Sequence, residues 1–393
     1  MKTNFQANIK KLYLFKFFYH LHFFGGVLVP FFTDWGGISF TKVMILQSWF
    51  MAWIFILEIP TGTIADYWGR KHSLALGTVI NIIAVLVYVS NPNFYIFLFA
   101  EFLWAVASAL YSGADQAFTY DTLKIIGRAK ESKKIFARIG SVKLAGLMIS
   151  APLGSLIAAY IGIRETMLFM AFPLIIAFFI SLTFLEPKTD HKIESKRYLH
   201  TLKNGVKYFH QNKILKILAL DFIVIQSIAY FMLWAYQPML KIAGVKIVYF
   251  GIVHAGFALM QILFMNNYER LEKLLGNKKR LIFYSAFITG LMFIMGGLTN
   301  VVYLIIPAIL IAGGLGLGRR ELFESYLNKH IPSERRATIL STVSMINKFI
   351  LVVISPLVGM LIDWSLGVAL IILGLIAVGF SFISRVEEKH LID

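Results

Sequence analysis

Apolar residues run along the chain in twelve long stretches separated by short polar segments. Each stretch is about 18 to 25 residues long, which is enough for a helix to cross a hydrocarbon core about 30 Å thick. The stretches are 12–32, 43–63, 73–90, 94–118, 139–160, 166–185, 216–240, 247–267, 280–298, 301–324, 337–362 and 365–385. The pattern therefore predicts an all-α integral membrane protein with twelve transmembrane helices.

One polar segment, residues 186–215, is longer than the others and divides the stretches six and six. It predicts a cytoplasmic linker between an N-terminal bundle, 1–185, and a C-terminal bundle, 216–393. The loop IADYWGRK at 64–71 is echoed by RLEKLLGNKK at 270–279. An echo in corresponding loops of a chain divided six and six indicates two homologous halves related by a pseudo-twofold axis.

Composition agrees with a membrane protein, because 58% of the residues are hydrophobic and only 15% are charged. The net charge of +17 first suggests a nucleic-acid partner. The basic residues, however, gather in alternate loops and at the helix mouths beside them, and Arg319 is counted among these. By the positive-inside rule this predicts a multi-pass protein of the inner membrane with both termini in the cytoplasm and no nucleic-acid partner. The chain has no cysteine, which excludes disulfides and thiolate metal sites.

A short motif lies in the loop between the second and third predicted helices. GTIADYWGRKHSL at 62–74 resembles the signature of the major facilitator superfamily, G-x-x-x-D-x-x-G-R-K/R. The matching residues are Gly62, Asp66, Gly69, Arg70 and Lys71. The resemblance implies a transporter made of two six-helix bundles that works by alternating access.

The resemblance also implies a partner for the signature arginine. An acidic residue at the cytoplasmic end of helix 4, here Asp121, commonly pairs with this arginine in the superfamily. We expect Asp121, Asp66 and Arg70 to form a charge cluster that breaks when the bundles rock, which would act as a conformational switch. The alternative is a solvated helix end of little energetic weight.

Shorter segments resemble a prokaryotic branch of drug-efflux-like or unassigned permeases. They are EIPTG at 58–62, SGADQAFTYDTL at 112–123, QPML at 237–240 and IPSERRATILS at 331–341. Two features depart from the superfamily pattern. Helix 4 lacks the arginine of many proton-coupled members, and GLMISAPLGS at 146–155 matches the antiporter motif of helix 5 only in part. The second departure weakens the case for export.

Helix 4 carries a polar stripe at helical spacing. The stripe consists of Glu101, Ser108, Ser112, Asp115 and Thr119. In the superfamily, helices 1, 4, 7 and 10 line the central cavity, so the resemblance implies that this stripe faces the substrate. Because ionisable groups in a membrane helix are costly, Glu101 and Asp115 are candidates for carrying protons. The alternative is that both lie near the membrane surfaces and are structural.

Three further ionisable side chains lie inside predicted helices: His20, Asp221 and Lys348. We favour His20 over His22 for the cavity, because two residues turn a helix by about 200°. Lys348 either reaches the membrane surface along its stem or needs a carboxylate partner. The remaining candidates for substrate contact are Tyr19, Gln226, Tyr230, Trp234, Gln237, His254 and Gln261. Each of these can instead hydrogen-bond a neighbouring helix.

Enzymatic motifs are missing from the sequence. GGLGLG at 313–318 imitates a phosphate-binding loop, but it lies in an apolar stretch with no strand before it, which favours close helix packing. We therefore expect no enzyme, no cofactor and no metal, and a monomer. The leading hypothesis is a proton-coupled exporter of amphipathic or cationic small molecules. The alternatives are an uptake symporter or facilitator for a small metabolite, and a membrane sensor that transports nothing.

Overall fold

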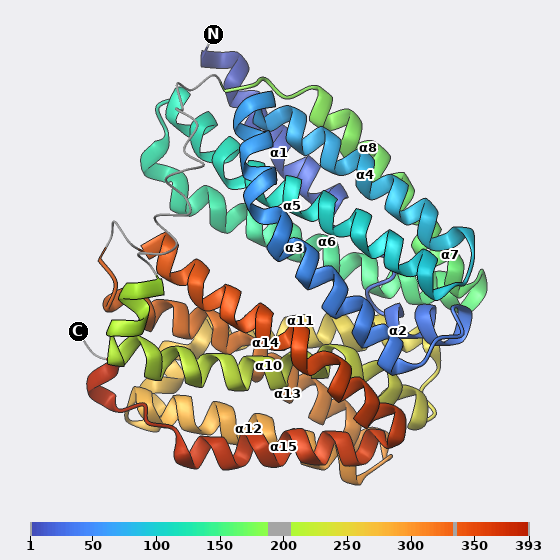
Figure 1. The fold of residues 1–393 in the computed structure, drawn as a ribbon, viewed down its shortest axis with the longest axis vertical. Coiled ribbons are helices and arrows are strands. Elements are labelled where there is room, and N and C mark those ends of the chain that lie inside the picture. Colours follow the sequence, from blue (N-terminus) through green and yellow to red (C-terminus); the bar gives the residue numbers. More distant parts are fainter. Residues whose placement is uncertain (1, 188–205, 333–335, 392–393) are drawn as a thin grey trace. The chain divides into compact units, whose positions relative to one another are not determined.

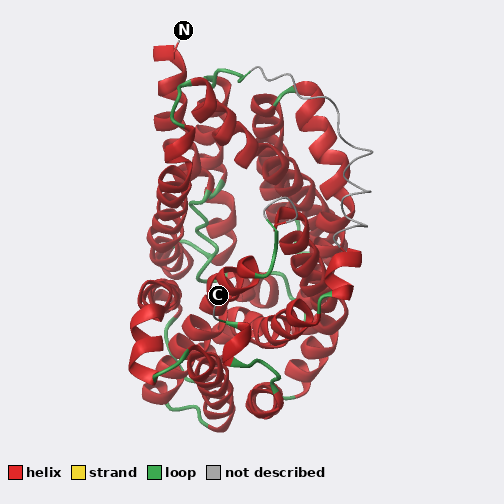
Figure 2. Cartoon of the chain, turned by 90° about the vertical axis from the view of Figure 1, so that its left-hand side faces the viewer, coloured by secondary structure: helices red, strands yellow, loops and turns green. Residues whose placement is uncertain are grey.

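The computed structural model describes residues 2–187, 206–332 and 336–391. Throughout these residues the chain forms helices and loops and no strand (Figure 2). Eleven helical segments of the described chain are long and apolar enough to cross a membrane. The all-α membrane fold is therefore confirmed. The expected span that is missing from these eleven is the first, 12–32, which is broken.

The chain divides into two compact units, and the first comprises residues 1–195 together with 247–252 (Figure 1, blue to green for residues up to 187). Its membrane-spanning helices are long, and α7 and α8 together make one span. Its elements are α1 (Lys2–Tyr19), α2 (Leu28–Pro30), the π-helical turn η1 (Phe31–Trp35), α3 (Phe40–Trp68), α4 (Arg70–Ser90), α5 (Phe94–Ile125), the 3-10 turn η2 (Ala129–Glu131), α6 (Ser132–Tyr160), α7 (Ile163–Phe169), α8 (Ala171–Leu182) and the 3-10 turn η3 (Ile247–Tyr249).

The second unit comprises residues 196–246 and 253–393 (Figure 1, yellow-green to red). Its elements are α10 (Lys213–Ile242), most of α11 (Phe250–Leu275), α12 (Lys278–Leu298), α13 (Val302–Lys329), α14 (Arg336–Trp364), α15 (Leu366–Ile383) and the 3-10 turn η5 (Glu388–His390). Helices α12 and α15 approach closely where Gly290 faces the backbone of Gly374. Small residues at such crossings let two membrane helices pack backbone against backbone.

The first predicted span, 12–32, is wrong as a continuous helix. Helix α1 ends at Tyr19, the chain turns through residues 20–27, and helical structure resumes only at Leu28. Short turns satisfy part of the freed backbone, since the Gly25 N–H donates to His22 O at 3.0 Å and the Val27 N–H to Phe24 O at 2.8 Å. Irregular backbone within a membrane protein occurs where protein or a water-filled cavity surrounds it. We call residues 20–27 the helix break.

Two glycines of α6 receive the backbone around the helix break. A Cβ atom on Gly146 would lie 3.1 Å from the carbonyl oxygen of Phe17, and one on Gly154 would collide with the carbonyl of Phe23. Both glycines belong to the partial antiporter motif of the fifth predicted span. In this chain, the small residues of that motif therefore allow the broken first span to pack against α6.

The GGLGLG segment lies inside α13, where its glycines allow close packing. Cβ atoms added at Gly313 and Gly318 would collide with the rings of Phe257 and Phe264 on α11, and one at Gly316 would meet Ala229 on α10. The expected role in helix packing, rather than phosphate binding, is confirmed.

The two echoed loops have the same construction. Gly69 and Gly276 have φ angles of +95° and +89°, a conformation that favours glycine. Helix α4 begins directly after Gly69, and α12 begins two residues after Gly276. The Glu186 carboxylate accepts the N–H groups of Arg70 and Lys71 at 2.8 and 2.7 Å. In the second unit, Glu388 likewise accepts the N–H groups at the start of α12, from Lys278 and Lys279 at 3.2 and 2.8 Å. A carboxylate at a helix N-terminus stabilises its unpaired N–H groups and its dipole.

Candidate functional site

An ion pair joins α1 to α5 in the first unit. The Lys16 ammonium contacts a carboxylate oxygen of Asp115 and donates to the Tyr111 hydroxyl. The Lys16 side chain is only 4% exposed and that of Asp115 17%. The second carboxylate oxygen of Asp115, Oδ1, is buried and accepts no hydrogen bond from the described residues. The site therefore holds a paired charge with one acceptor still available.

Aromatic rings surround this pair. Tyr19 and Tyr111 stack with ring centroids 4.5 Å apart and an angle of 6° between the rings, and the Lys16 ammonium lies 4.5 Å from the centroid of Tyr111. A cation over an aromatic face gains electrostatic stabilisation from the ring. The arrangement places the predicted residue Tyr19 beside Asp115.

The argument that His20 and His22 cannot both face the cavity does not hold in the structure. Their rings stack with centroids 5.9 Å apart and an angle of 25°. The argument assumed a continuous helix, and it fails because α1 ends at Tyr19 and both histidines lie in the helix break. His20 is buried and its Nδ1 donates to the Lys16 carbonyl at 2.9 Å.

Glu101 lies on α5 but contacts other helices than Asp115 does. Its Oε1 accepts a hydrogen bond from the Gln47 amide of α3 at 3.1 Å, and its carboxyl group also bonds to the Tyr88 hydroxyl of α4. The residue is only 5% exposed. The two carboxyl groups that the sequence placed on one face of helix 4 thus meet different neighbours, an ammonium at Asp115 and two neutral groups at Glu101.

Arg70 and Asp121 form an ion pair between the N-terminus of α4 and the C-terminal part of α5. Both residues are buried, with exposures of 8% and 4%. Lys71, which follows Arg70, bonds through its backbone to Glu186. Asp66, the third predicted member of this cluster, and Gly62 of the signature motif lie outside the residues whose side chains the structure describes. The contact that the signature implied for Arg70 is present, and its role as a switch stays a prediction.

An ion pair between Asp221 and Arg319 joins α10 to α13 in the second unit. Arg319 donates through Nη2 to Asp221 Oδ1, and the Ser384 hydroxyl donates to Asp221 Oδ2. The other guanidinium nitrogen, Nη1, donates to the Ile282 carbonyl at 2.6 Å and to the Ser285 hydroxyl. Counting Arg319 among the residues outside or at the mouths of the helices is wrong, because α13 continues to Lys329 and the arginine is completely buried.

A chain of hydrogen bonds links α10 to α11. The Gln237 amide donates to the Tyr236 hydroxyl at 2.8 Å, and this hydroxyl lies 2.9 Å from Nδ1 of His254. The indole N–H of Trp234, on the same helix, is buried and has no hydrogen-bond partner among the described residues. Gln237 and His254 both bond to the Tyr236 hydroxyl, in a network that joins helices, which is the alternative to substrate contact that the sequence left open for each of them.

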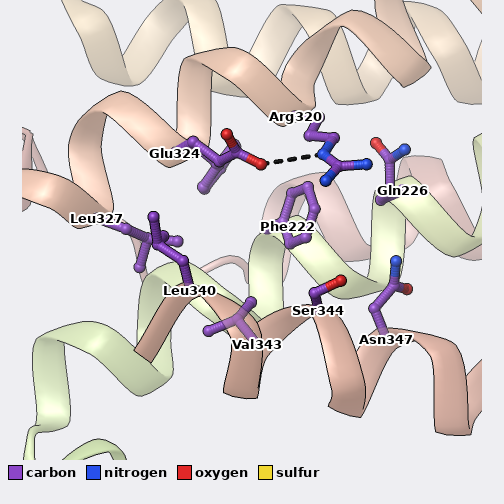
Figure 3. Close-up of a pocket in the computed structure, with 10 residues that line it drawn as sticks. Phe222, Gln226, Arg320, Glu324, Leu327, Leu340, Val343, Ser344 and Asn347 are labelled. Carbon is purple, nitrogen blue, oxygen red and sulfur yellow. Dashed lines mark hydrogen bonds and ion pairs between the residues drawn. The ribbon is translucent and has the colours of Figure 1, made fainter. Parts of the chain in front are cut away.

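Polar side chains of α10, α13 and α14 meet at a small cavity of about 40 Å³ (Figure 3). Ser344 and Asn347 lie on the α14 side of the cavity, and the amide of Gln226 points toward the guanidinium of Arg320, which is paired with Glu324. Oε1 of Gln226 is buried and accepts no hydrogen bond from the residues described. The volume is enough for a few water molecules or one polar group of a solute.

The remaining predicted residues are more dispersed. Ser112 is exposed and donates to the Ala109 carbonyl at 3.1 Å, and Thr119 of the same stripe is buried and donates to Asp115 O at 2.9 Å. Lys348 follows Asn347 on α14, is half-buried and has no ion-pair partner among the described residues. Three predicted residues are half-buried and take part in none of the networks described above: Ser108, Tyr230 and Gln261.

Sequence reasoning did not assign several members of these networks. It did not pair Lys16 with Asp115 or Arg319 with Asp221, since each pair joins residues about 100 positions apart. It also did not assign Glu186 and Glu388 to the helix starts that they hold. A lone charge inside an apolar stretch, as at Lys16, is the signal that would have suggested the first pair.

A comparison with protein families identifies this architecture. The family model described as the Major Facilitator Superfamily matches residues 14–348, which is most of the chain. The chain belongs to the major facilitator superfamily. It is therefore a multi-pass membrane transporter of this type and not an enzyme, and the family expected from the signature motif is confirmed. A search among proteins of curated function finds no match to this chain.

Solved structures of transporters share this fold. A variant of the nucleoside transporter NupG is 13% identical, with a TM-score of 0.81 over 95% of this chain and 98% of that one. A POT family transporter in complex with 5-aminolevulinic acid is 18% identical, with a TM-score of 0.74 over 98% and 97%. A bacterial homolog of the human lysosomal transporter Spinster is 15% identical, with a TM-score of 0.75 over 98% and 97%. The TM-scores show a common fold, and at such low identities the likeness shows the fold alone. The drug-efflux branch stays a prediction.

Proposed function

We propose that this protein is a proton-coupled transporter of a small polar solute and that Glu101 carries the coupling proton. The observation that carries the proposal is the contrast between three carboxyl groups in membrane-spanning helices. Asp115 and Asp221 are each paired with a cation, whereas the partners of Glu101 are an amide and a phenol. A buried carboxylate without a counter-charge is costly, and binding a proton removes that cost.

The same contrast bears on the solute. The expectation of a cationic substrate rested on free acidic groups among aromatic residues, but Lys16 and Arg319 already neutralise two of the three. In the first unit the acceptor left open at Asp115 suits a hydrogen-bond donor of a polar, neutral or zwitterionic solute, and in the second unit the unpaired amide oxygen of Gln226 does so separately. These observations favour the small-metabolite alternative over an exporter of amphipathic cations.

The Arg70–Asp121 pair serves in this proposal as a switch that forms in one conformation and breaks in the other. Both groups are buried, so breaking the pair carries a free-energy penalty that must be offset elsewhere in the cycle. The proposed topology keeps both termini in the cytoplasm, because the basic residues gather in alternate loops. The proposed transport unit is a monomer.

A panel of three solutes tests the substrate class. Uridine represents nucleosides, 5-aminolevulinic acid represents zwitterions, and tetraphenylphosphonium represents lipophilic cations. Binding to the purified protein should raise the thermal unfolding temperature for a polar solute and leave it unchanged for the cation, because only a ligand of the folded state shifts the unfolding equilibrium. A shift with tetraphenylphosphonium alone would contradict the polar-solute assignment and restore the exporter hypothesis.

A further inference from the structure

The second unit contains a large apolar groove that the proposed transport function does not use. It encloses about 600 Å³ between α10, α14 and α15, and its walls are mostly apolar, with Ile223, Ile350 and Ile376 one from each helix. Leu220, at its edge, is 56% exposed. Exposed apolar surface of this size marks an interaction site or a surface that meets lipid.

The groove has the length of a lipid chain. Its lining on α10 extends from Lys216 to Phe231, which corresponds to about 22 Å at 1.5 Å per residue. An acyl chain in one leaflet spans about half of a hydrocarbon core of about 30 Å. A single chain therefore fits along the groove beside α10.

One end of the groove differs from the rest in charge. Lys216 is exposed and is the one charged residue among the described residues that line the groove. It lies in the first turn of α10, next to the segment predicted to be the cytoplasmic linker. Basic residues at the membrane surface attract anionic lipid headgroups, at about 1 kcal/mol per lysine.

We propose that this groove binds one anionic phospholipid, with an acyl chain lying along α10 between α14 and α15 and the headgroup phosphate at Lys216. The apolar walls account for the chain and the single lysine for the preference in headgroup. Other occupants, such as the rest of this chain or a second copy, would exclude lipid from the groove.

The test uses the absence of native cysteine from the chain. A bimane label at Leu220→Cys reports on the groove, and one at Leu375→Cys, equally exposed at 56% but not lining it, is the matched control. The labelled proteins are placed in nanodiscs of phosphatidylethanolamine containing either brominated phosphatidylglycerol or brominated phosphatidylcholine, and quenching is titrated against the brominated fraction.

The proposal predicts half-maximal quenching at Leu220 with about five-fold less brominated phosphatidylglycerol than phosphatidylcholine. The Leu375 label should respond equally to both lipids. Lys216→Glu should remove the preference at Leu220, whereas Lys273→Glu, an exposed lysine on α11 away from the groove, should leave it unchanged. Equal quenching at Leu220 by both lipids, a preference that survives Lys216→Glu, or no quenching at Leu220 by either lipid would each overturn the proposal.

Discussion

The two units each contain one buried ion pair between their first and fourth membrane-spanning segments, but with opposite charge order. In the first unit the cation, Lys16, lies on the first segment and the anion, Asp115, on the fourth; in the second unit Asp221 lies on the first and Arg319 on the fourth. Asp221 uses both carboxylate oxygens, whereas Asp115 keeps one without a hydrogen bond among the described residues.

This difference separates a structural pair from a functional one. Arg319 bonds to a carbonyl and a hydroxyl of α12 besides Asp221, so the second pair ties three helices together. The first pair lies beside the helix break and is partly accessible. Discontinuous helices and incompletely bonded polar groups are where transporters of this kind bind their ligands. We infer that the first pair takes part in solute binding and the second holds the fold.

The largest effect is expected from Arg319→Met. It leaves Asp221 buried without its counter-charge, which should destabilise the protein by about 3 to 5 kcal/mol. Thermal unfolding in detergent measures the loss, with Arg320→Met, which removes an exposed pair worth at most about 1 kcal/mol, as the control. The double variant Arg319→Met/Asp221→Asn should recover much of the loss, and a double variant no better than the single would contradict the assignment.

Lys16→Met and Asp115→Asn should destabilise the protein less, by about 1 to 3 kcal/mol, because the first pair is partly accessible. Both should lower solute transport in proteoliposomes at least ten-fold, while Lys10→Met, exposed on the same helix, should leave it unchanged. Exchanging the charges, as Lys16→Asp/Asp115→Lys, should recover stability without transport. Normal transport by this exchanged variant would show that charge order is irrelevant and that the first pair is structural too.

Arg70→Ala tests the switch in the first unit. Turnover should fall about five-fold or more, because the pair with Asp121 biases one conformation over the other, while the dissociation constant of the solute should change less. Transport rates in proteoliposomes and solute titrations of the purified protein separate the two quantities. Lys124→Ala, which removes an exposed basic residue in the last turn of α5, is the control and should leave turnover unchanged. Unchanged turnover in Arg70→Ala would remove the switch from the mechanism.

The smallest effects are expected at the feature that the two units share, a carboxylate that accepts the N–H groups at the start of a helix. Glu186→Gln and Glu388→Gln each weaken a carboxylate that holds the start of a helix, and each should lower the free energy of unfolding by about 0.3 to 1 kcal/mol. Thermal unfolding of the two variants side by side measures this. A loss of several kcal/mol in one and none in the other would contradict the common construction of the two loops.

The sequence was informative wherever a local pattern decides the structure. Long apolar stretches located the membrane spans, and the family resemblance identified Arg70 and its partner Asp121. It failed where the chain departs from a regular helix. The His20–His22 argument required a continuous helix, and α1 stops at Tyr19. A charged residue near the end of an apolar stretch is also easily taken for the end of the helix. Arg319 was assigned in this way, but α13 continues to Lys329.

The contacts between side chains of different helices were harder to predict from the sequence than the helices themselves. The stripe on helix 4 was recognised, but its periodicity could not show that Glu101 meets α3 and α4 while Asp115 meets α1. Packing across the whole unit decides which helices surround each face of α5, and this packing cannot be read from a single sequence. The different roles proposed for Glu101, Asp115 and Asp221 therefore rest on their contacts in the structure rather than on their spacing in the sequence.

Proton flux in the Glu101→Gln variant tests the central claim most directly. Proteoliposomes containing internal pyranine and either wild-type protein or the variant receive each solute of the panel, with Glu131→Gln, a surface carboxyl paired with Arg128, as the control. The wild type and the control should show a change in internal pH when a transported solute is added. Glu101→Gln should still bind that solute and show no coupled change in pH. Coupled proton flux at the wild-type rate in Glu101→Gln would contradict the account.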